Sequence, residues 1–255
     1  MPRQSSPRAI KPKSAQGFTR KLLAWFARHG RDLPWRRTRD PYRVLVSEFM
    51  LQQTQVSRVT EYYPRFLARF PTVEHLARAK KSAVMEEWDG LGYYARASNL
   101  HALARVVSKD RAGELPAHPD ELIKLPGVGR YTAGAVATFA YEQPVAAVDT
   151  NVARVIRRVF YGERGVGSGP LRRKPQGRNA PSGTTPHIPL PKIWELAHTL
   201  VPKSGKRAWK FNQAIMELGA LVCVARKPKC PECPVRTSCR TGKRLRQPRA
   251  GARGQ

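Results

Sequence analysis

The stretch LPGVGRYTAGAVATFAYEQPVAAVDTNVARVIRR, residues 125–158, decides the fold. It begins with a turn that contains Gly127 and Gly129, and it continues into an apolar helical pattern. Both glycines allow left-handed backbone conformations and the close approach of another molecule. Asp149 then opens a second helical pattern, at a position where aspartate is a preferred N-cap. The stretch therefore predicts two helices joined by a tight turn, followed by a capped helix.

Helical periodicity continues on both sides of this stretch. In FTRKLLAWFARHG, residues 18–30, apolar side chains recur at the spacing of one broad helix face. Similar patterns predict helices within the ranges 42–70, 72–79, 81–92, 95–110, 118–129, 192–202 and 208–223. No break between them is flanked by the alternating pattern of a strand, so we expect an all-α protein.

The helices are expected to form two lobes. Residues 33–143 are expected to form one lobe, which ends with the glycine turn and its helix, and residues 17–32 and 144–240 the other. Within the second lobe, residues 161–191 hold six Gly and six Pro and few apolar side chains. Such a composition cannot bury a core, and it predicts a flexible loop.

The charge of the chain indicates a polyanionic partner. The 47 Lys and Arg exceed the 18 Asp and Glu, which gives a formal net charge of +29. This excess is too large for an ordinary enzyme of small neutral substrates, and nucleic acid is the simplest partner. Residues 1–16 and 241–255 contain no acidic residue and are expected to be disordered basic ends.

The chain shows no sign of a membrane segment. No apolar run approaches the ~20 residues that span a bilayer, and the N-terminus lacks the apolar stretch of a secretory signal. We therefore expect a cytoplasmic, nucleoid-associated protein, and a monomer.

All four cysteines lie close together near the C-terminus. They follow the spacing C-x6-C-x2-C-x5-C, as Cys223, Cys230, Cys233 and Cys239. Four thiolates this close suit a tetrahedral zinc ion or an iron–sulfur cluster. A pair of disulfides is less expected inside a cell.

Together these motifs resemble the adenine glycosylase (MutY-like) branch of the helix-hairpin-helix DNA glycosylase superfamily, which also includes endonuclease III. The resemblance covers residues 18–239 and rests on LPWR (33–36), VSEFMLQQTQV (46–56), GLGYYARASNLH (90–101), LPGVGRYTAGA (125–135) and FNQAIMELGALVC (211–223). It implies a two-lobed all-α fold that removes mispaired adenine opposite 8-oxoguanine or guanine in base excision repair. Typical members of the branch continue into a C-terminal domain that reads 8-oxoguanine, and this chain is expected to lack it.

Two carboxylates match the chemistry of N-glycosidic cleavage, which needs an acid for the departing base and an anion for the sugar cation. Glu48 lies in the apolar run RVLVSEFML, where desolvation would raise its pKa and keep it protonated, unless it is an exposed helix residue. The resemblance makes Glu48 the acid and Asp149 the anion, with Asn151 as a supporting amide. It also implies that Glu48 and Asp149 face each other across a groove between the lobes, where DNA lies.

Tyr131 indicates the type of glycosylase. Bifunctional members carry a lysine at the matching position, and its amine forms a Schiff base with the sugar and cuts the strand. A phenol cannot form that imine, so we expect a monofunctional enzyme that leaves an abasic site. A thymine or uracil mismatch glycosylase of the same fold can also carry tyrosine there, and an inactive DNA-binding scaffold is a further alternative.

The resemblance also assigns residues that hold the DNA and the extruded base. The expected partner is double-stranded DNA with a mismatch or an oxidative lesion. The residues expected to contact it are Gln52, Gln53, Tyr93, Gly127, Gly129 and Arg130. Trp35, Arg36 and Glu217 match positions of the adenine pocket, although a Trp after Pro is as often part of the core.

The cysteine spacing matches the 4Fe-4S loop of the superfamily, so the resemblance favours a 4Fe-4S cluster over zinc. The cluster is expected to be structural. It would hold a basic loop with Arg226, Lys227 and Lys229 against the DNA.

Overall fold

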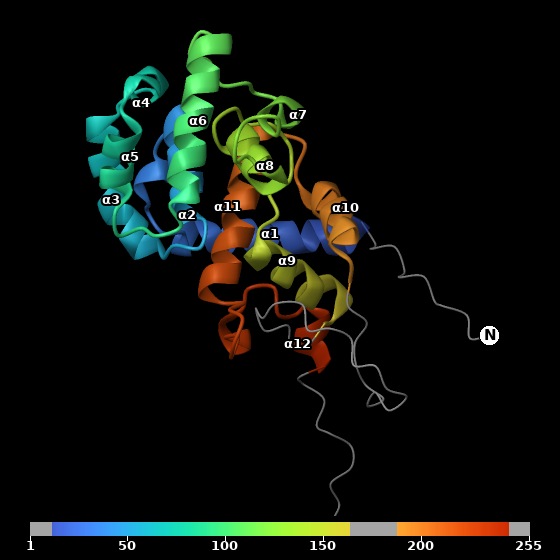
Figure 1. Cartoon of the computed structure of the whole chain (residues 1–255). Coiled ribbons are helices and arrows are strands. Elements are labelled where there is room, and N and C mark those ends of the chain that lie inside the picture. Colours follow the sequence, from blue (N-terminus) through green and yellow to red (C-terminus); the bar gives the residue numbers. More distant parts are fainter. Residues whose placement is uncertain (1–11, 164–187, 245–255) are drawn as a thin grey trace, which may run out of the picture. The chain divides into compact units, whose positions relative to one another are not determined.

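The structure, a computed structural model, describes residues 12–163 and 188–244 (Figure 1). These residues form helices and no strand, which confirms the expected all-α class. In chain order the elements are α1 (Pro12–His29), η1 (Pro34–Arg36), α2 (Pro41–Leu51), α3 (Val56–Arg69), α4 (Val73–Arg78), α5 (Lys81–Trp88), α6 (Ala95–Asp110), α7 (Pro119–Leu122), α8 (Arg130–Phe139), α9 (Thr150–Ile156), the π-helical turn η2 (Arg157–Tyr161), α10 (Leu190–Leu200), α11 (Gly205–Leu221), η3 (Cys230–Glu232) and α12 (Arg240–Arg244).

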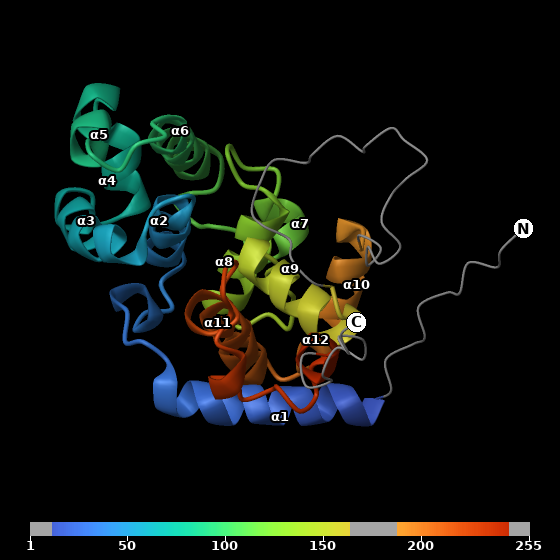
Figure 2. The ribbon, with the colours of Figure 1, turned by 90° about the horizontal axis from the view of Figure 1, so that it is seen from below.

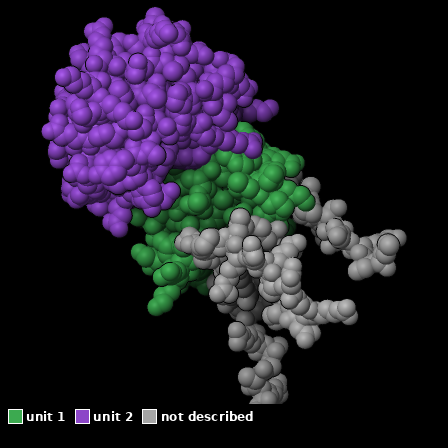
Figure 3. Space-filling view, in the orientation of Figure 1, with its two compact units in different colours: residues 1–30, 148–200, 213–255 green, residues 31–147, 201–212 purple. Residues whose placement is uncertain are grey.

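Two compact units divide the chain (Figure 3). Unit 1 comprises residues 1–30, 148–200 and 213–255, and unit 2 comprises residues 31–147 and 201–212. The two units differ from the expected lobes chiefly at residues 201–212, which we expected with the cysteines. The Asn212 side chain explains the difference, because its Oδ1 accepts from the Ala147 amide at 3.1 Å and its Nδ2 donates to the Val145 carbonyl at 2.9 Å. These bonds attach the first half of α11 to unit 2.

Unit 2 is built around α2, which packs on α3, α6 and α8. Asp40 caps the start of α2, where its Oδ1 accepts from the Arg43 amide at 2.9 Å, and Pro41 is the first helical residue. Residues 44–50 are all buried. A helix that is buried on all sides needs apolar residues all round, and the run RVLVSEFML supplies them at residues 44–50 except at Ser47 and Glu48.

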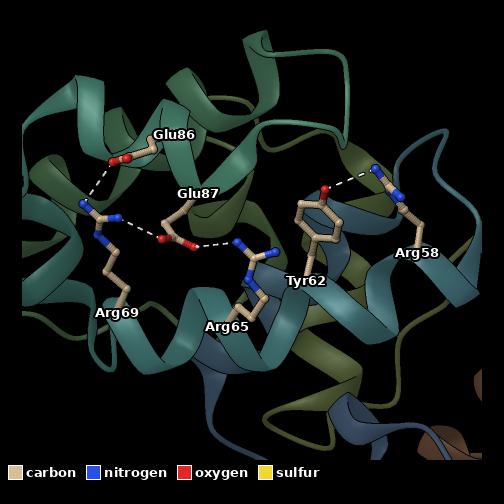
Figure 4. A network of polar contacts seen from close by, with 6 residues as sticks. All are labelled: Arg58, Tyr62, Arg65, Arg69, Glu86 and Glu87. Atoms are coloured by element: carbon tan, nitrogen blue, oxygen red, sulfur yellow. Dashed lines mark hydrogen bonds and ion pairs between the residues drawn. The ribbon is translucent and has the colours of Figure 1, made fainter.

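Helices α3, α4, α5 and α6 pack together on one side of α2 (Figures 1 and 2). Phe66 of α3 packs edge-on against Trp88 of α5, with ring centroids 5.8 Å apart. On the surface of the same helices, Arg69 bridges Glu86 at 3.1 Å and Glu87 at 2.8 Å (Figure 4). The pair with Glu86 is exposed on both sides, and such ion pairs contribute little to stability.

The glycine turn of unit 2 joins α7 to α8. Gly127 has φ +73°, and a Cβ at this position would lie 2.5 Å from Asn99 Cβ, so both backbone and space require glycine. Gly129 does not use the left-handed conformation that glycine allows. Gly129 has φ −91° and is the N-cap of α8, with nothing within 4 Å of a Cβ built on it.

Unit 1 contains α1, α9, η2, α10, the second half of α11, η3 and α12. Phe18 of α1 packs edge-on against Phe160 of η2, with ring centroids 5.1 Å apart. Helix α12 lies against η2, because Thr241 Oγ1 donates to the Arg158 carbonyl at 2.8 Å.

The expected disordered segments overlap the described residues at their edges. Helix α1 already begins at Pro12, and α12 extends to Arg244, so residues 12–16 and 241–244 are helical where we expected disorder. The remainder of the expected arm, loop and tail, residues 1–11, 164–187 and 245–255, lies outside the described residues. In the ranges 12–163 and 188–244, no helix combines the length and apolar character needed to cross a membrane.

Candidate functional site

Glu48 lies in the middle of α2, in unit 2, and is only 4% exposed. The alternative of an exposed helix residue is therefore wrong, and the expected burial is confirmed. Its chain neighbours Ser47 and Phe49 are each 1% exposed. A carboxyl group inside such a helix costs free energy, which is why burial of this kind points to a function.

The end of α2 carries the two glutamines that we expected to contact DNA. Gln52 Nε2 lies 3.5 Å from Thr132 Oγ1 of α8. Gln53 is exposed and has φ +57°, a left-handed conformation in the turn that follows α2. Tyr93, in the turn before α6, is 60% exposed and also left-handed, with φ +49°. Non-glycine residues adopt this conformation rarely, and such strain gathers at functional sites.

Arg96 of α6 connects these two segments and was missed by the sequence reasoning. Its guanidinium donates to backbone carbonyls at the end of α2 and in the turn that carries Tyr93. One signal was present in the sequence, because Arg96 precedes the buried Leu100 by one helical turn and so lies on the core-facing side of α6.

Helix α8 carries the remaining candidates of the hairpin. Arg130 and Tyr131 are its first two residues, Arg130 exposed and Tyr131 partly buried. Gly129 supplies no side-chain cap to this helix. Because α8 packs on α2, Tyr131 and Glu48 stand on neighbouring helices of the same unit.

Trp35 and Arg36 lie in η1. Trp35 is 7% exposed and packs edge-on against Tyr63 of α3, with ring centroids 5.6 Å apart. Arg36 Nη1 donates to the Arg31 carbonyl at 2.8 Å. Trp35 is thus part of the core of unit 2, the second of the two roles that its sequence left open.

Asp149 lies in unit 1 as the N-cap of α9, as the sequence predicts. Its Oδ1 accepts from the Val152 amide at 2.7 Å, and its Oδ2 accepts from Asn151 Nδ2 at 2.8 Å. Burial raises the pKa of the Asp149 carboxyl, while these two hydrogen bonds act in the opposite direction and favour the anion. The cap therefore fixes where the carboxylate points.

Arg154 donates a hydrogen bond to the side chain of Asn151, which in turn donates to Asp149. Its Nη2 donates to Asn151 Oδ1 at 2.6 Å and to the Gly219 carbonyl at 2.8 Å, and its Nε donates to the Cys223 carbonyl at 2.8 Å. A chain of hydrogen bonds thus runs from Asp149 through Asn151 and Arg154 to the start of the cysteine loop. The sequence reasoning missed Arg154, since nothing local marks which arginine of VARVIRR turns toward α11.

The four cysteines form no disulfide and line one cavity in unit 1. Arg158 also lines it, together with apolar side chains that include Leu218, Val222 and Val235. Burial raises the pKa of Cys233 to about 12 and also raises the pKa of Cys239. Within the ranges that the structure describes, no three His, Cys, Asp or Glu side chains group as ligands of a metal ion.

Arg158 organises the loop that carries these cysteines, and it too was missed. Its Nη1 donates to the Val224 carbonyl at 2.7 Å and lies 3.5 Å from Cys223 Sγ, and its Nη2 donates to the Ala225 carbonyl at 2.8 Å. Glu217 belongs to the same unit, in α11, and is 1% exposed.

A family comparison accounts for most of these positions. Residues 46–168 match the family model described as HhH-GPD superfamily base excision DNA repair protein. The chain belongs to this superfamily. The matched range of the HhH-GPD model contains Glu48, the hairpin, Asp149 and Asn151, while Trp35, Arg36, Glu217 and the cysteines lie outside it.

Two relatives with similar sequences are both adenine DNA glycosylases. The chain is 42% identical to the adenine DNA glycosylase of Rattus norvegicus over 92% of its own length and 43% of the relative's length. It is 40% identical to the adenine DNA glycosylase of Mycolicibacterium smegmatis over 86% of its own length and 67% of the relative's. The chain thus spans less than half the length of the mammalian relatives that it matches.

A solved structure is similar throughout the chain. The structure of a thermostable thymine-DNA glycosylase is 32% identical in sequence and has a TM-score of 0.75. The match covers 91% of this chain and 98% of the chain of that glycosylase. The fold alone therefore does not distinguish an adenine from a thymine substrate.

Proposed function

We propose that this chain is a monofunctional DNA glycosylase of base excision repair that removes mispaired adenine, opposite 8-oxoguanine or guanine, from double-stranded DNA. The observation that carries the proposal is Glu48, a carboxyl group that is 4% exposed in the middle of a buried helix. The match to adenine DNA glycosylases at 40 to 42% identity supports adenine as the base. The net charge of +29 supports a polyanionic substrate.

The two carboxyl groups divide the reaction. Glu48 donates a proton to a ring nitrogen of adenine, so that the electrons of the breaking bond between sugar and base can leave with the base. Asp149 supplies a negative charge to the sugar cation that remains, and Asn151 and Val152 orient it. Water then adds to the sugar carbon, a proton is released, and the products are free adenine and an abasic site.

The hairpin holds the backbone of the DNA. The first amides of a helix lack acceptors within the helix, and the positive end of its dipole attracts an anion. Gly129 leaves open space at the start of α8, where a phosphate would approach. Arg130 adds positive charge there. Gln52, Gln53 and Tyr93 fill the space in the duplex that the extruded adenine leaves. By their match to family positions, Arg36 and Glu217 are proposed to recognise the adenine, and Trp35, a core residue of unit 2, to act only as support.

The cysteine cavity suits a 4Fe-4S cluster. All four thiols line it, and their spacing C-x6-C-x2-C-x5-C matches the 4Fe-4S loop of the superfamily, which favours the cluster over a zinc ion. Cys223, Cys230, Cys233 and Cys239 would be its ligands. The cluster would bind four thiolates and cross-link the loop between α11 and α12, and Arg158 would stabilise the negative charge of the ligands.

A second candidate is a thymine or uracil mismatch glycosylase. The 32% identity to a thymine-DNA glycosylase over nearly its whole chain favours it. The adenine proposal takes precedence because it gives the buried Glu48 a role and because the adenine relatives are more similar. A scaffold without activity is a third candidate, although it leaves Glu48 and the Asp149 chain without a purpose.

The deciding experiment is single-turnover base release from duplexes with A:8-oxoG, A:G, T:G and U:G pairs. Each reaction is divided, and one half is heated with alkali. Released adenine, with strand breaks only after alkali, is the expected result. Released thymine or uracil would replace the adenine proposal with the second candidate. Strand breaks without alkali that a Tyr131→Phe substitution abolishes would contradict a monofunctional enzyme.

A further inference from the structure

Two segments of unit 2 that carry candidate DNA contacts meet at one buried arginine. Arg96, in the first turn of α6, is 7% exposed. Its Nη1 donates to three carbonyls at the end of α2, those of Phe49 at 3.0 Å, Met50 at 2.7 Å and Gln52 at 2.6 Å. Its Nη2 donates to two carbonyls of the turn before α6, those of Leu91 at 3.0 Å and Gly92 at 2.9 Å.

Two of these carbonyls, those of Gln52 and Gly92, directly precede residues with a strained backbone conformation. The Gln52 carbonyl belongs to the peptide plane that leads into Gln53, and the Gly92 carbonyl belongs to the plane that leads into Tyr93. Gln53 and Tyr93 have φ values of +57° and +49°. A left-handed non-glycine residue costs about 1–3 kcal/mol and persists only where its surroundings fix it. Arg96 fixes the peptide plane on the N-terminal side of both.

Lysine could not replace Arg96 in this role. A guanidinium offers five N–H donors in a rigid plane, whereas an ammonium offers three on a flexible stem. The five acceptors of the Arg96 guanidinium are backbone carbonyls, and two of them lie at the negative end of α2, which favours a cation. The ring of Tyr93 itself lies 5.6 Å from Arg96 Cζ.

Two further side chains, the buried Trp88 and the exposed Arg58, also hold the turn. Trp88 Nε1 donates to the Gly92 carbonyl at 3.2 Å, and Arg58 Nη2 lies 3.3 Å from the Gly90 carbonyl and 3.2 Å from the hydroxyl of Tyr62 (Figure 4). Gly90 has φ +85°, and a Cβ there would lie 2.4 Å from the Tyr62 hydroxyl. The turn therefore has one defined conformation, with Tyr93 directed outward and 60% exposed.

We propose that Arg96 is a positioning residue for base extrusion, which holds Gln53 and Tyr93 in the left-handed conformations that present their side chains to the duplex. The inference rests on the proposed function, because it assumes that a base leaves the stack. It predicts that Arg96 acts on extrusion and not on the chemistry at Glu48.

The test compares Arg96→Lys with Arg105→Lys, a control on the exposed side of the same helix. Single-turnover adenine release is measured on an A:G duplex and on a duplex with adenine opposite an abasic-site analogue, where extrusion costs least. We expect Arg96→Lys to slow release from the A:G duplex by about 10- to 100-fold, as misplaced groups do, with a much smaller loss on the unpaired adenine. The control should match the wild type on both. Equal losses on both duplexes, or no loss on the A:G duplex, would overturn the inference.

A second readout separates this inference from the proposed function. 2-Aminopurine in place of the target adenine fluoresces when it is unstacked, and no bond needs to break. If the wild type releases no adenine, the proposed function fails, while weaker fluorescence with Arg96→Lys still supports the inference and equal fluorescence refutes it.

Should Arg96→Lys not fold, Arg58→Met removes the outer contact of the turn at an exposed residue. The same selective loss is expected of it, and an unselective loss or none would refute the inference.

Discussion

Asp149 combines a buried position with hydrogen bonds that favour its anion. The Asp149→Asn variant keeps a good N-cap, so we expect it to fold and bind DNA. It loses the negative charge, and base release should fall by at least about 100-fold, as when one electrostatic contact to a transition state is removed. Equal release by Asp149→Asn in single-turnover assays would contradict the role of this residue.

Asp149 also predicts a pH dependence. Its pKa is raised by burial in the folded protein, so the folded state binds this proton more tightly than the unfolded state. The resulting stability is present below the unfolded pKa and is lost as pH rises through the folded pKa. The free energy of unfolding of the wild type, measured in urea, should therefore fall with rising pH relative to that of Asp149→Asn. The rate of base release should rise over the same range, because the Asp149 anion forms. A wild type that becomes more stable than the variant at higher pH would be inconsistent with this.

Glu48 is the residue whose burial most needs an explanation. Glu48→Gln keeps the volume of the side chain but cannot donate a carboxylic proton. Base release should fall by about 100- to 10,000-fold, the range of a lost general acid, with little change in DNA binding. Glu61→Gln, at an exposed position of α3, is the matched control and should behave as the wild type. An active Glu48→Gln variant would favour the scaffold.

At the scale of elements, substitutions of the two hairpin glycines are expected to affect different properties, stability at Gly127 and DNA binding at Gly129. Gly127→Ala places a Cβ 2.5 Å from Asn99 Cβ at φ +73° and should destabilise the protein by about 1–3 kcal/mol in urea unfolding. Gly129→Ser meets nothing within 4 Å and adds a favourable N-cap, so stability should be kept. Its side chain nevertheless occupies the approach to α8, and DNA affinity measured by anisotropy should fall. Normal binding by Gly129→Ser would make the hairpin a simple connector.

The chain from Asp149 to the cysteine loop is an element-scale link within unit 1. Arg154 bonds both Asn151 and the Cys223 carbonyl, and Arg158 bonds the two carbonyls that follow. The loop thereby supports the cap of α9 through the two arginines.

At the scale of the molecule, the cysteine cavity predicts the metal content. The purified protein should contain iron and inorganic sulfide in equal amounts, and no stoichiometric zinc. Removing the cluster should lower the melting temperature, because the loop between α11 and α12 would lose the cross-link among its four cysteines. A colourless, zinc-containing and fully active preparation would refute the iron assignment.

The charge of the whole chain predicts strong salt dependence of DNA binding. With a net charge of +29, the plot of log affinity against log salt should fall with a slope that reflects about 0.9 per phosphate contact. Arg130→Ala should reduce that slope by about 1 and weaken all sequences alike. Arg111 is paired with Glu121 at 3.1 Å, so Arg111→Ala is the control and should leave the slope nearly unchanged. An unchanged slope in Arg130→Ala would place the DNA away from the hairpin.

Local patterns in the sequence determined where the helices lie, that Glu48 is buried, that Asp149 caps α9 and that four cysteines share one loop. Each of these follows from residues within a few turns of one another, where periodicity and capping act. The tertiary structure alone decided which distant backbone groups a buried arginine would serve. The five carbonyls of Arg96 come from two segments about 40 residues apart, and Arg154 and Arg158 reach a loop more than 60 residues away. It also assigned residues 201–212 to unit 2 through Asn212. Such contacts depend on how the chain closes over long distances, which no local pattern encodes.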